Sequence, residues 1–390
     1  MSNDPLSIEA LCAELDAPEW VLGFDHIPGG KVVFGPGKLA TIGSEAVALG
    51  GRYVLIVTDP GIAQTGCVSR AADALRDAGL EVSIFDEVHE NPTTDDVDAC
   101  VEVAKAAGID LIVGLGGGSS MDTAKGCNFV LTNGGTMHDY WGVNKASKPM
   151  LPLIAVPTTS GTGSECQSFA LIADVETHAK MACGDKKAAA AVAILDPELT
   201  LTMPSAVTAH TGIDAIAHAL ETGVCNKRTD ISSAYSRAAW QLLNDGLERV
   251  MNQPDDIEAR ARMQLGSAFA GTAIENSMLG FAHSCANPLT AHYGIVHGQA
   301  VGAMLPEVVA YNSQDEAVAA IYSALYDGDL SARVKELLAL SQMNQSLAEL
   351  GIEESDLPQL AGEAAKQWTA QFNPVEGGVD AIEAIYRAAM

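Results

Sequence analysis

The sequence has few basic residues. Lysine and arginine together number 22 against 50 aspartates and glutamates, which gives a formal net charge of −28 at pH 7. A negative field of this size repels nucleic-acid phosphates and anionic lipids. We therefore expect no nucleic acid and no membrane surface among the main partners, although a small ligand can still bind in a local basic or dipolar pocket.

Long apolar runs and paired cysteine motifs are also missing. No stretch of 18 apolar residues occurs, so we expect no transmembrane helix. The opening residues Met1 to Asp4 contain no basic segment, and acidic residues follow them, so we expect no signal peptide. The eight cysteines form no Cys-x-x-Cys pair, which is typical of reduced thiols in a cytoplasmic protein.

The order of the hydrophobic patterns predicts two kinds of fold. The 390 residues are enough for about two domains. Short β-branched runs alternate with helical stretches from residue 52 to about 197, which predicts an α/β, Rossmann-like parallel sheet. The spacing from about 205 to 390 has a helical period, which predicts an all-α second half with a ligand cleft at the joint. The expected strands cover 52–58, 81–85, 110–114 and 153–156. Three helices are expected between or after them: one that ends near residue 79, one over about 94–107 and one that begins at 119.

A glycine-rich turn, Gly114-Leu-Gly-Gly-Gly-Ser-Ser120, follows one expected strand and opens a helix. Its backbone N–H groups can bind a phosphate, although a tight structural turn uses the same residues. The usual dinucleotide fingerprint is not met, because Ser119 stands where its third glycine would fall and no acidic residue closes a strand about twenty residues later.

Asp59 ends an earlier expected strand. Its carboxylate can accept hydrogen bonds from the hydroxyls of an adenosine ribose and would repel a 2′-phosphate, which favours NAD over NADP. The alternative is a helix cap before Pro60. The hydroxyl-rich loop from Pro157 to Glu165 also leaves a strand end, and it suits either a nicotinamide amide or phosphate, or a structural turn.

Histidines gather in the helical half. Asp214 and His218 are four residues apart, so both lie on one face of a helix and can reach one ion. The residues between them are apolar, where a carboxylate and an imidazole are unfavourable unless paired or metal-bound. His283 and His297 could complete a set of three imidazoles and one carboxylate, which suits Fe(II), Zn or Mn. A simple Asp–His hydrogen bond is the alternative for the first pair.

Together these motifs resemble the iron-dependent (group III) alcohol dehydrogenases, a family that includes lactaldehyde reductases and 1,3-propanediol dehydrogenases. The resemblance extends from about Val32 to the final helix. Its most specific parts are Gly116-Gly-Gly-Ser-Ser-Met-Asp-Thr-Ala-Lys125, Pro157-Thr-Thr-Ser-Gly-Thr-Gly-Ser-Glu165, and the segments 212–218 and 283–298.

The resemblance implies domains, cofactors and site residues. We expect a dinucleotide-binding α/β domain over 1–200, with an N-terminal extension over 1–20, and an all-helical metal-binding domain over 201–390. The implied cofactors are NAD and Fe(II), with zinc as the alternative metal, and the implied assembly is a homo-oligomer. By position, the metal ligands of the family fall on Asp214, His218, His283 and His297. Its cofactor contacts fall on Asp59, Asn91, Gly117, Gly118, Ser119, Thr158, Thr162 and Lys180.

One position departs from the family pattern. Many members carry a further histidine four residues after the first metal-ligand histidine of the second half, whereas this chain has Asn287. An amide cannot carry a proton at neutral pH, so we expect Asn287 to act as a pocket residue, with His292 as a substitute proton carrier if the fold brings it close.

The expected function is hydride transfer between NAD and a small primary alcohol, diol or aldehyde in the cytoplasm. Two alternatives are a metal- and NAD-using cyclising lyase of the dehydroquinate synthase type and a non-catalytic NAD-binding protein. The lyase would need a cluster of basic residues for a polyanionic substrate, and no such cluster is evident among the 22 lysines and arginines.

Overall fold

The computed structural model describes residues 6–13, 15, 17–24, 30–177 and 179–390. The chain divides into two compact units. The first contains the described residues of 1–11, 24–159 and 163–202, and the second contains those of 12–23, 160–162 and 203–390. The domain boundary at residue 200 stays a prediction. So does the N-terminal extension, in which positions 1–5, 14 and 16 lie outside the described residues.

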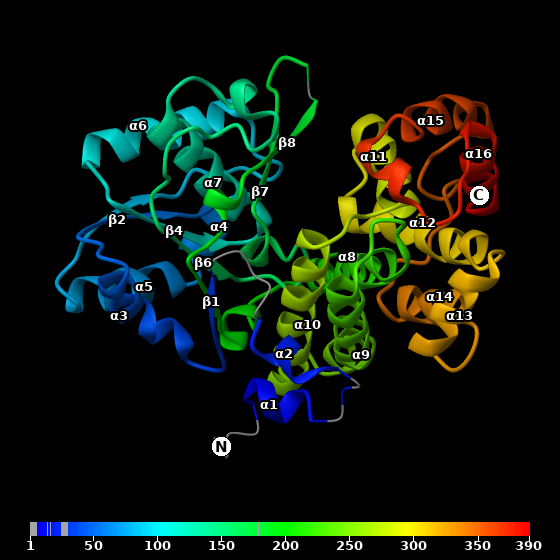
Figure 1. The fold of residues 1–390 in the computed structure, drawn as a ribbon, viewed down its shortest axis with the longest axis horizontal. Coiled ribbons are helices and arrows are strands. Elements are labelled where there is room, and N and C mark those ends of the chain that lie inside the picture. The colour runs from blue at the N-terminus through cyan, green and yellow to red at the C-terminus, as the bar shows by residue number, and fades with distance from the viewer. Residues whose placement is uncertain (1–5, 14, 16, 25–29, 178) are drawn as a thin grey trace. The chain divides into compact units, whose positions relative to one another are not determined.

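A six-stranded sheet forms the centre of the first unit (Figure 1). All neighbouring strands are parallel, in the order β1-β9-β6-β4-β2-β3. The predicted strands correspond to β2, β3, β4 and β6, which confirms the expected parallel α/β fold. The bounds are β1 Lys31–Phe34, β2 Tyr53–Val57, β3 Glu81–Phe85, β4 Leu111–Gly116, β6 Leu153–Pro157 and β9 Val192–Leu195.

Helices cover both faces of this sheet, which is why β4 and β6 are buried along their whole length. Successive strand residues face opposite sides. Leu55 and Ile112 join the core under α6 and α7, whereas Ile56 and Val113 join the core under α3 and α5. The helices are α3 Ile42–Ala48, α4 Pro60–Ala63, α5 Cys67–Asp77, α6 Thr94–Ala107 and α7 Gly118–Asn133.

A second, three-stranded sheet in the first unit is absent from the sequence prediction. It has the order β5-β8-β7, with β5 Gly142–Val143, β7 Phe169–Ala173 and β8 Lys180–Gly184. Strand β8 reads Lys-Met-Ala-Cys-Gly and contains no β-branched residue, so its strand propensity is low. It forms through antiparallel pairing with β7, where the ring of Phe169 fills the space that a side chain at Gly184 would need.

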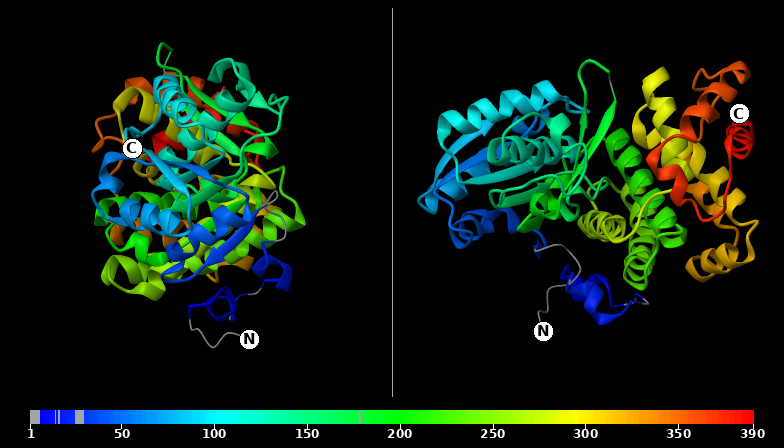
Figure 2. Two further views of the ribbon diagram at one scale, coloured as in Figure 1. Left: turned by 90° about the vertical axis from the view of Figure 1, so that its left-hand side faces the viewer. Right: turned by 45° about the horizontal axis from the view of Figure 1, so that its top comes forward.

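The second unit is helical, as predicted (Figure 2). Among the described residues, no strand follows β9. The short helix α2, Glu19–Leu22, belongs to this unit, and Trp20 makes an edge contact with Tyr235 at 5.8 Å between ring centroids. Short helix α1, Ile8–Leu11, belongs to the first unit. The main helices are α8 Ser205–Val224, α9 Asp230–Asn252, α10 Ile257–Glu275, α11 Phe281–Tyr293, α12 His297–Asn312, α13 Glu316–Leu325, α14 Leu330–Leu340, α15 Leu357–Ala364 and α16 Val379–Ala388.

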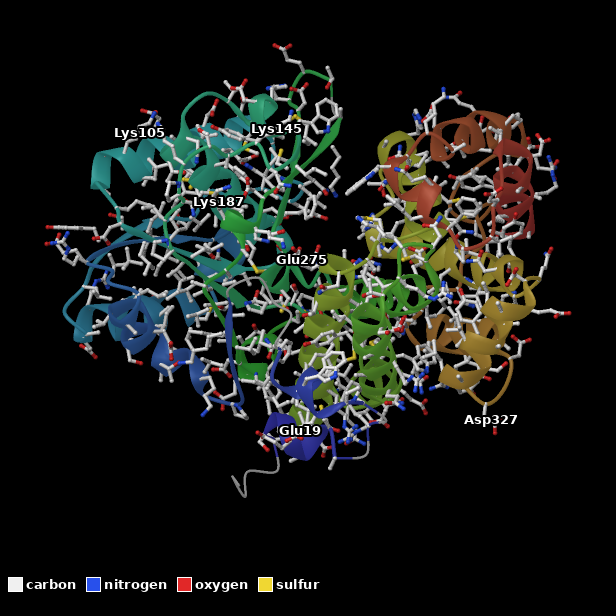
Figure 3. All side chains as sticks on the ribbon, viewed as in Figure 1. Glu19, Lys105, Lys145, Lys187, Glu275 and Asp327 are labelled. Atoms are coloured by element: carbon white, nitrogen blue, oxygen red, sulfur yellow. The ribbon has the colours of Figure 1, made fainter. Side chains whose placement is uncertain are left out.

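Charged side chains lie on the surface of the first unit, and some are paired (Figure 3). Lys105 Nζ at the end of α6 lies 2.9 Å from Glu102 Oε1, and Lys187 Nζ lies 2.9 Å from Asp185 Oδ1. In the part of the chain that the structure describes, no helix is both long and apolar enough to cross a membrane.

Asp196, directly after β9, is fully buried and holds two loops at one end of the sheet. Its carboxylate accepts hydrogen bonds from the backbone N–H groups of Gly37 at 3.1 Å and Leu39 at 2.9 Å, which follow β1. It also accepts one from Glu198 at 3.1 Å. Removing this carboxylate leaves the buried N–H of Leu39 and two part-buried N–H groups without their acceptor, which costs more than the hydrogen bonds themselves contribute.

We therefore expect Asp196→Ala to lower the free energy of unfolding by about 3 kcal/mol. Urea denaturation followed by circular dichroism measures the change. Asp77→Ala, at an exposed position near the end of α5, is the matched control and should change stability by no more than about 0.5 kcal/mol. Equal stabilities of the two variants would contradict the anchoring role of Asp196.

Candidate functional site

Helix α8 presents a carboxylate and an imidazole on one buried face. Asp214 is 6% exposed and His218 is 5% exposed. The four-residue spacing brings His218 Nε2 to 3.6 Å from Asp214 Oδ1. Two polar groups inside an apolar helix face need compensation from elsewhere in the fold.

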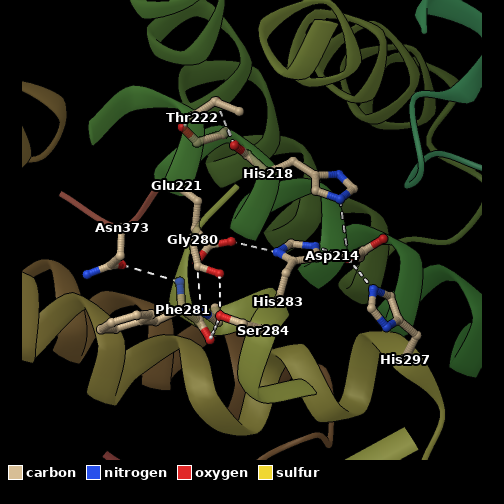
Figure 4. A network of polar contacts seen from close by, with 12 residues as sticks. Asp214, His218, Glu221, Thr222, Gly280, Phe281, His283, Ser284, His297 and Asn373 are labelled. Atoms are coloured by element: carbon tan, nitrogen blue, oxygen red, sulfur yellow. Dashed lines mark hydrogen bonds and ion pairs between the residues drawn. The ribbon is translucent and has the colours of Figure 1, made fainter. Parts of the chain in front are cut away.

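That compensation comes from the first turns of two other helices (Figure 4). His283 in α11 and His297 in α12 place their Nε2 atoms 3.3 Å and 3.7 Å from the same Asp214 oxygen. The rings of His218 and His283 are stacked, with centroids 4.8 Å apart. Three imidazoles from three helices therefore converge on one carboxylate oxygen.

Burial and the neighbouring charges shift the pKa values of this cluster in different directions. Burial alone would raise the pKa of Asp214, but the imidazoles of His218, His283 and His297 outweigh burial and hold the pKa well below its usual range. Burial lowers the pKa of His218. For His283, burial is outweighed by hydrogen bonds with Asp214 and Glu221, which raise its pKa to about 9.

The donor set fits a transition metal. Asp214, His283 and His297 each offer one ligand atom, and these atoms lie within 4.8 Å of one another. His218 Nε2 lies 3.6 Å from the Asp214 carboxylate, and its ring stacks on that of His283. Mixed imidazole and carboxylate donors suit Fe(II) or zinc. A simple Asp214–His218 pair would not explain why two further imidazoles face the same oxygen.

The outward ring nitrogens of two histidines are also held. His218 Nδ1 lies 3.2 Å from the carbonyl oxygen of Gly161, and His283 Nδ1 lies 2.6 Å from Glu221 Oε2. Sequence reasoning missed both partners. Glu221 carries a signal in hindsight, since it lies seven residues after Asp214 and so on the same face of α8. The Gly161 carbonyl carries none, because a backbone atom has no residue identity.

Asn287 and His292 make contacts of their own. Asn287, one turn after His283 in α11, donates its Nδ2 hydrogen to Gln367 Oε1 at 3.1 Å. His292 Nε2 lies 2.6 Å from Glu363 Oε2, and its side chain is 42% exposed. The imidazole that the sequence offered as a substitute proton carrier therefore pairs with a carboxylate on α15.

In the first unit, several predicted cofactor residues meet where the strand order reverses. Strand β3 lies on one side of β2, and β4 and β6 lie on the other. Ligands of open α/β sheets bind at such a reversal, beyond the carboxyl ends of the strands. Asp59 follows β2 there, and Gly117, Gly118 and Ser119 follow β4 at the start of α7.

Asp59 caps helix α4, as the alternative reading of the sequence proposed. Its Oδ1 accepts the backbone N–H of Ile62 at 2.9 Å. Its Oδ2 lies 3.4 Å from Ser120 Oγ, beside the glycine-rich turn. Gly116 has a φ of 152°, and a side chain there would collide with Ser120. Glycine is therefore required at this turn, and the Asp59 carboxylate lies next to it.

Thr158 joins the same group. Its backbone N–H donates to the Gly116 carbonyl at 2.9 Å. Its hydroxyl is buried and has no hydrogen-bond partner within the structure. Fully buried Lys125 of α7 holds the following segment by donating to the Ser164 carbonyl at 2.6 Å and to the Phe169 carbonyl at 3.0 Å.

The remaining predicted contacts lie elsewhere. Asn91 is exposed, with φ of 53°, next to Pro92, whose carbonyl accepts from Ala173 at 2.8 Å. Lys180 pairs with Ala173 in the three-stranded sheet and is exposed. These two residues therefore share a second location. Thr162 is half-buried in the 160–162 segment of the second unit.

The residues at the carboxyl ends of β2, β4 and β6, namely Asp59, the glycine-rich turn and Thr158, fit a dinucleotide. The N-cap of α7 is a glycine without a side-chain cap, so the first N–H groups of that helix are open to an anion. The buried, unpartnered hydroxyl of Thr158 is the kind of polar atom that a ligand satisfies.

Comparison with known proteins decides the family. The sequence pattern described as "Iron-containing alcohol dehydrogenase" matches residues 29–197, and that described as "Fe-containing alcohol dehydrogenase family, C-terminal" matches residues 208–390. The chain belongs to the iron-containing alcohol dehydrogenase family. This confirms the resemblance found in the sequence and favours a metal-dependent alcohol dehydrogenase over the lyase and the non-catalytic protein.

Individual relatives of the family cover nearly the whole chain. An NAD-dependent methanol dehydrogenase of Bacillus methanolicus is 35% identical, over 93% of this chain and 99% of its own length. A solved 1,3-propanediol oxidoreductase is 32% identical with a TM-score of 0.89, over 92% of this chain and 97% of its own. The sulfoacetaldehyde reductase from Bifidobacterium kashiwanohense, solved in complex with NAD+, is 29% identical with a TM-score of 0.85, over 93% of this chain and 97% of its own.

We expect His283→Ala to lose most bound metal and activity while it keeps its fold, because three candidate ligands remain on packed helices but hold the ion more weakly. The metal-to-protein ratio after anaerobic reconstitution with Fe(II) measures the loss, and circular dichroism checks the fold. The control is His292→Ala in the same helix, which should keep its metal. Full occupancy in His283→Ala would refute its assignment as a ligand.

Proposed function

We propose that this protein transfers hydride between NAD and a small primary alcohol, diol or aldehyde. The observation that carries the proposal is the convergence of His218, His283 and His297 on the Asp214 carboxylate. The names of the relatives, which include methanol and 1,3-propanediol dehydrogenases, support the class of substrate.

Asp214, His218, His283 and His297 would hold the metal, with Fe(II) first and zinc as the alternative. The ion would supply Lewis acidity that lowers the pKa of an alcohol hydroxyl. The chain contributes a dry, prearranged donor set: three of the four side chains are at most 6% exposed. Because the donors lie on packed helices, their side chains would need to move little during the reaction.

Asp59, Gly117, Gly118, Ser119 and Thr158 would hold the cofactor at one edge of the sheet, with Asn91, Thr162 and Lys180 as further contacts. NAD would supply the hydride acceptor at its nicotinamide ring. The start of α7 offers N–H groups to the pyrophosphate, and Oδ2 of Asp59 offers an acceptor to ribose hydroxyls while Oδ1 caps α4.

Asn287 would form part of the substrate pocket and would not carry the proton. It lies one helical turn after His283 and thus on the same face of α11. Its amide donates to Gln367, so the amide oxygen remains available as an acceptor. His292 is the weaker candidate for proton transfer, since its ring pairs with Glu363.

We further propose a cytoplasmic homo-oligomer. The burial of all eight cysteines as thiols supports a reducing compartment. The oligomeric state rests on the family resemblance alone, and sedimentation analysis of the purified protein would measure it.

The function is tested by anaerobic purification, metal analysis and a screen of NADH consumption over short aldehydes and diol-derived aldehydes. The proposal expects metal-dependent NADH oxidation that disappears after chelation and returns with Fe(II) or zinc. A metal-loaded protein that oxidises NADH with none of these aldehydes would contradict it.

The role of Asp59 gives a test of cofactor choice. Asp59→Ser keeps an N-cap hydroxyl for α4 but removes the charge that repels a 2′-phosphate, so we expect the preference for NAD over NADP to fall by about 10-fold or more, or roughly 1.4 kcal/mol. The ratio of kcat/KM values for the two cofactors measures it, with Asp77→Ser as the control. A wild-type preference for NADP would show that the interpretation of Asp59 is wrong.

Installing an imidazole at the departing position tests the proton route. We expect Asn287→His to introduce or shift an ionisation between about pH 6 and 8 in kcat/KM for alcohol oxidation, because unperturbed imidazole titrates near 6.5. Asn287→Ala, the control, should change KM and substrate preference without a new ionisation. If the histidine variant and wild type have identical pH profiles while a deuterium isotope effect shows that hydride transfer limits the rate, position 287 is not in the proton pathway.

A further inference from the structure

Glu221 is a buried carboxylate to which the proposed function assigns no role. It lies in α8 on the face that carries Asp214 and His218, and it is only 4% exposed. A buried carboxylate is expensive unless it is paired, so its partners show what it does.

Both partners of Glu221 lie in the first turn of α11 (Figure 4). Oε1 accepts the backbone N–H of Ala282 at 2.6 Å, and Oε2 lies 2.6 Å from His283 Nδ1. The N-cap of α11 is Gly280, which has no side chain to cap the helix. Glu221 therefore caps α11 from another helix, and its negative charge lies where the helix dipole favours it.

Gly280 makes room for this arrangement. A Cβ atom at that position would lie 3.1 Å from Glu221 Oε1 and 2.9 Å from Asn373 Oδ1. The same Asn373 oxygen accepts the backbone N–H of Phe281 at 3.3 Å. Two side chains distant in sequence thus share the start of α11, and only Glu221 also contacts an imidazole.

The chemistry of the contact fixes the protonation of one ring nitrogen. An ionised carboxylate can only accept hydrogen bonds, so Nδ1 of His283 must carry a hydrogen. The other nitrogen, Nε2, faces Asp214 at 3.3 Å and is then the atom that offers a lone pair to a metal. His218 has only a backbone carbonyl at 3.2 Å in the equivalent place, which is a weaker restraint.

We propose that Glu221 is a positioning residue of the metal site: it sets the tautomer and ring orientation of His283 while it caps α11, and so it increases metal affinity. This inference rests on the proposed metal site. It requires no contact between Glu221 and substrate or cofactor.

Glu221→Gln tests the proposal with little change in volume. An amide has one acceptor and one donor end, so it can serve the Ala282 N–H or the Nδ1–H of His283 but not both. An NH2 group facing Nδ1 would favour the tautomer in which Nε2 is protonated. We expect the dissociation constant for zinc, measured by chelator competition, to rise by about 10- to 100-fold.

The matched control is Asn373→Ala. It removes the hydrogen bond to Phe281 at the same helix start but leaves both contacts of Glu221. The proposal expects both variants to melt at a lower temperature than wild type, and only Glu221→Gln to bind zinc more weakly. Equal losses of affinity in the two variants would mean that Glu221 acts only by holding the helix, and the proposal would fall.

Nitrogen NMR of histidine-labelled, zinc-loaded wild-type protein provides a second test that needs no variant. The proposal expects the His283 signals of a protonated Nδ1 and a metal-bound Nε2, and the reverse assignment overturns it. If wild type binds neither zinc nor Fe(II), the proposed metal site itself fails and this inference with it. If wild type binds metal tightly and Glu221→Gln binds it equally well, the inference alone fails.

Discussion

The buried carboxylate of Asp214 is the constraint on which the helical unit depends. A charge that is 6% exposed is unfavourable unless other groups compensate it. Here imidazole nitrogens of His218, His283 and His297 stand 3.3 to 3.7 Å away. Because these nitrogens come from α8 and from the first turns of α11 and α12, the three helices must meet in one relative arrangement. The contacts that compensate the buried Asp214 charge are thus the same contacts that bring the candidate metal ligands together.

A different constraint acts in the first unit, where topology brings the polar residues together. The reversal of strand order between β2 and β4 leaves their carboxyl ends side by side, with Val57 paired to Gly114. Asp59 follows β2 and the glycine-rich turn follows β4, so the pairing of these two strands is enough to place them side by side. Glycine at 116 is imposed by its positive φ and by the side chain of Ser120. A sheet edge assembled in this way suits a long, flexible cofactor, whereas a metal needs the tighter convergence found around Asp214.

The parts that sequence could predict are those encoded by local spacing. Helix 94–107 and strand 81–85 follow from periodicity and occur with the predicted bounds, and the pair Asp214 and His218 follows from a four-residue spacing. Strand β8 could not be predicted, because its residues become a strand only through pairing with β7. The role of Glu221 was missed for a related reason: its spacing places it on the same face of α8 as Asp214, but its partners lie 61 and 62 residues further along the chain, and no local pattern records that contact.

Both histidines that lie at helix starts face a carboxylate. His283 and His297 lie in the first turns of α11 and α12, where the helix dipole disfavours a protonated imidazole. For His283, burial would lower the pKa, but hydrogen bonds with Asp214 and Glu221 outweigh burial and raise the pKa to about 9. The two carboxylates on either side of His283 therefore favour positive charge on this ring. A divalent cation held by these residues would take the place of a proton on the ring, and Asp214 and Glu221 would favour its charge as well, so metal affinity would fall at low pH.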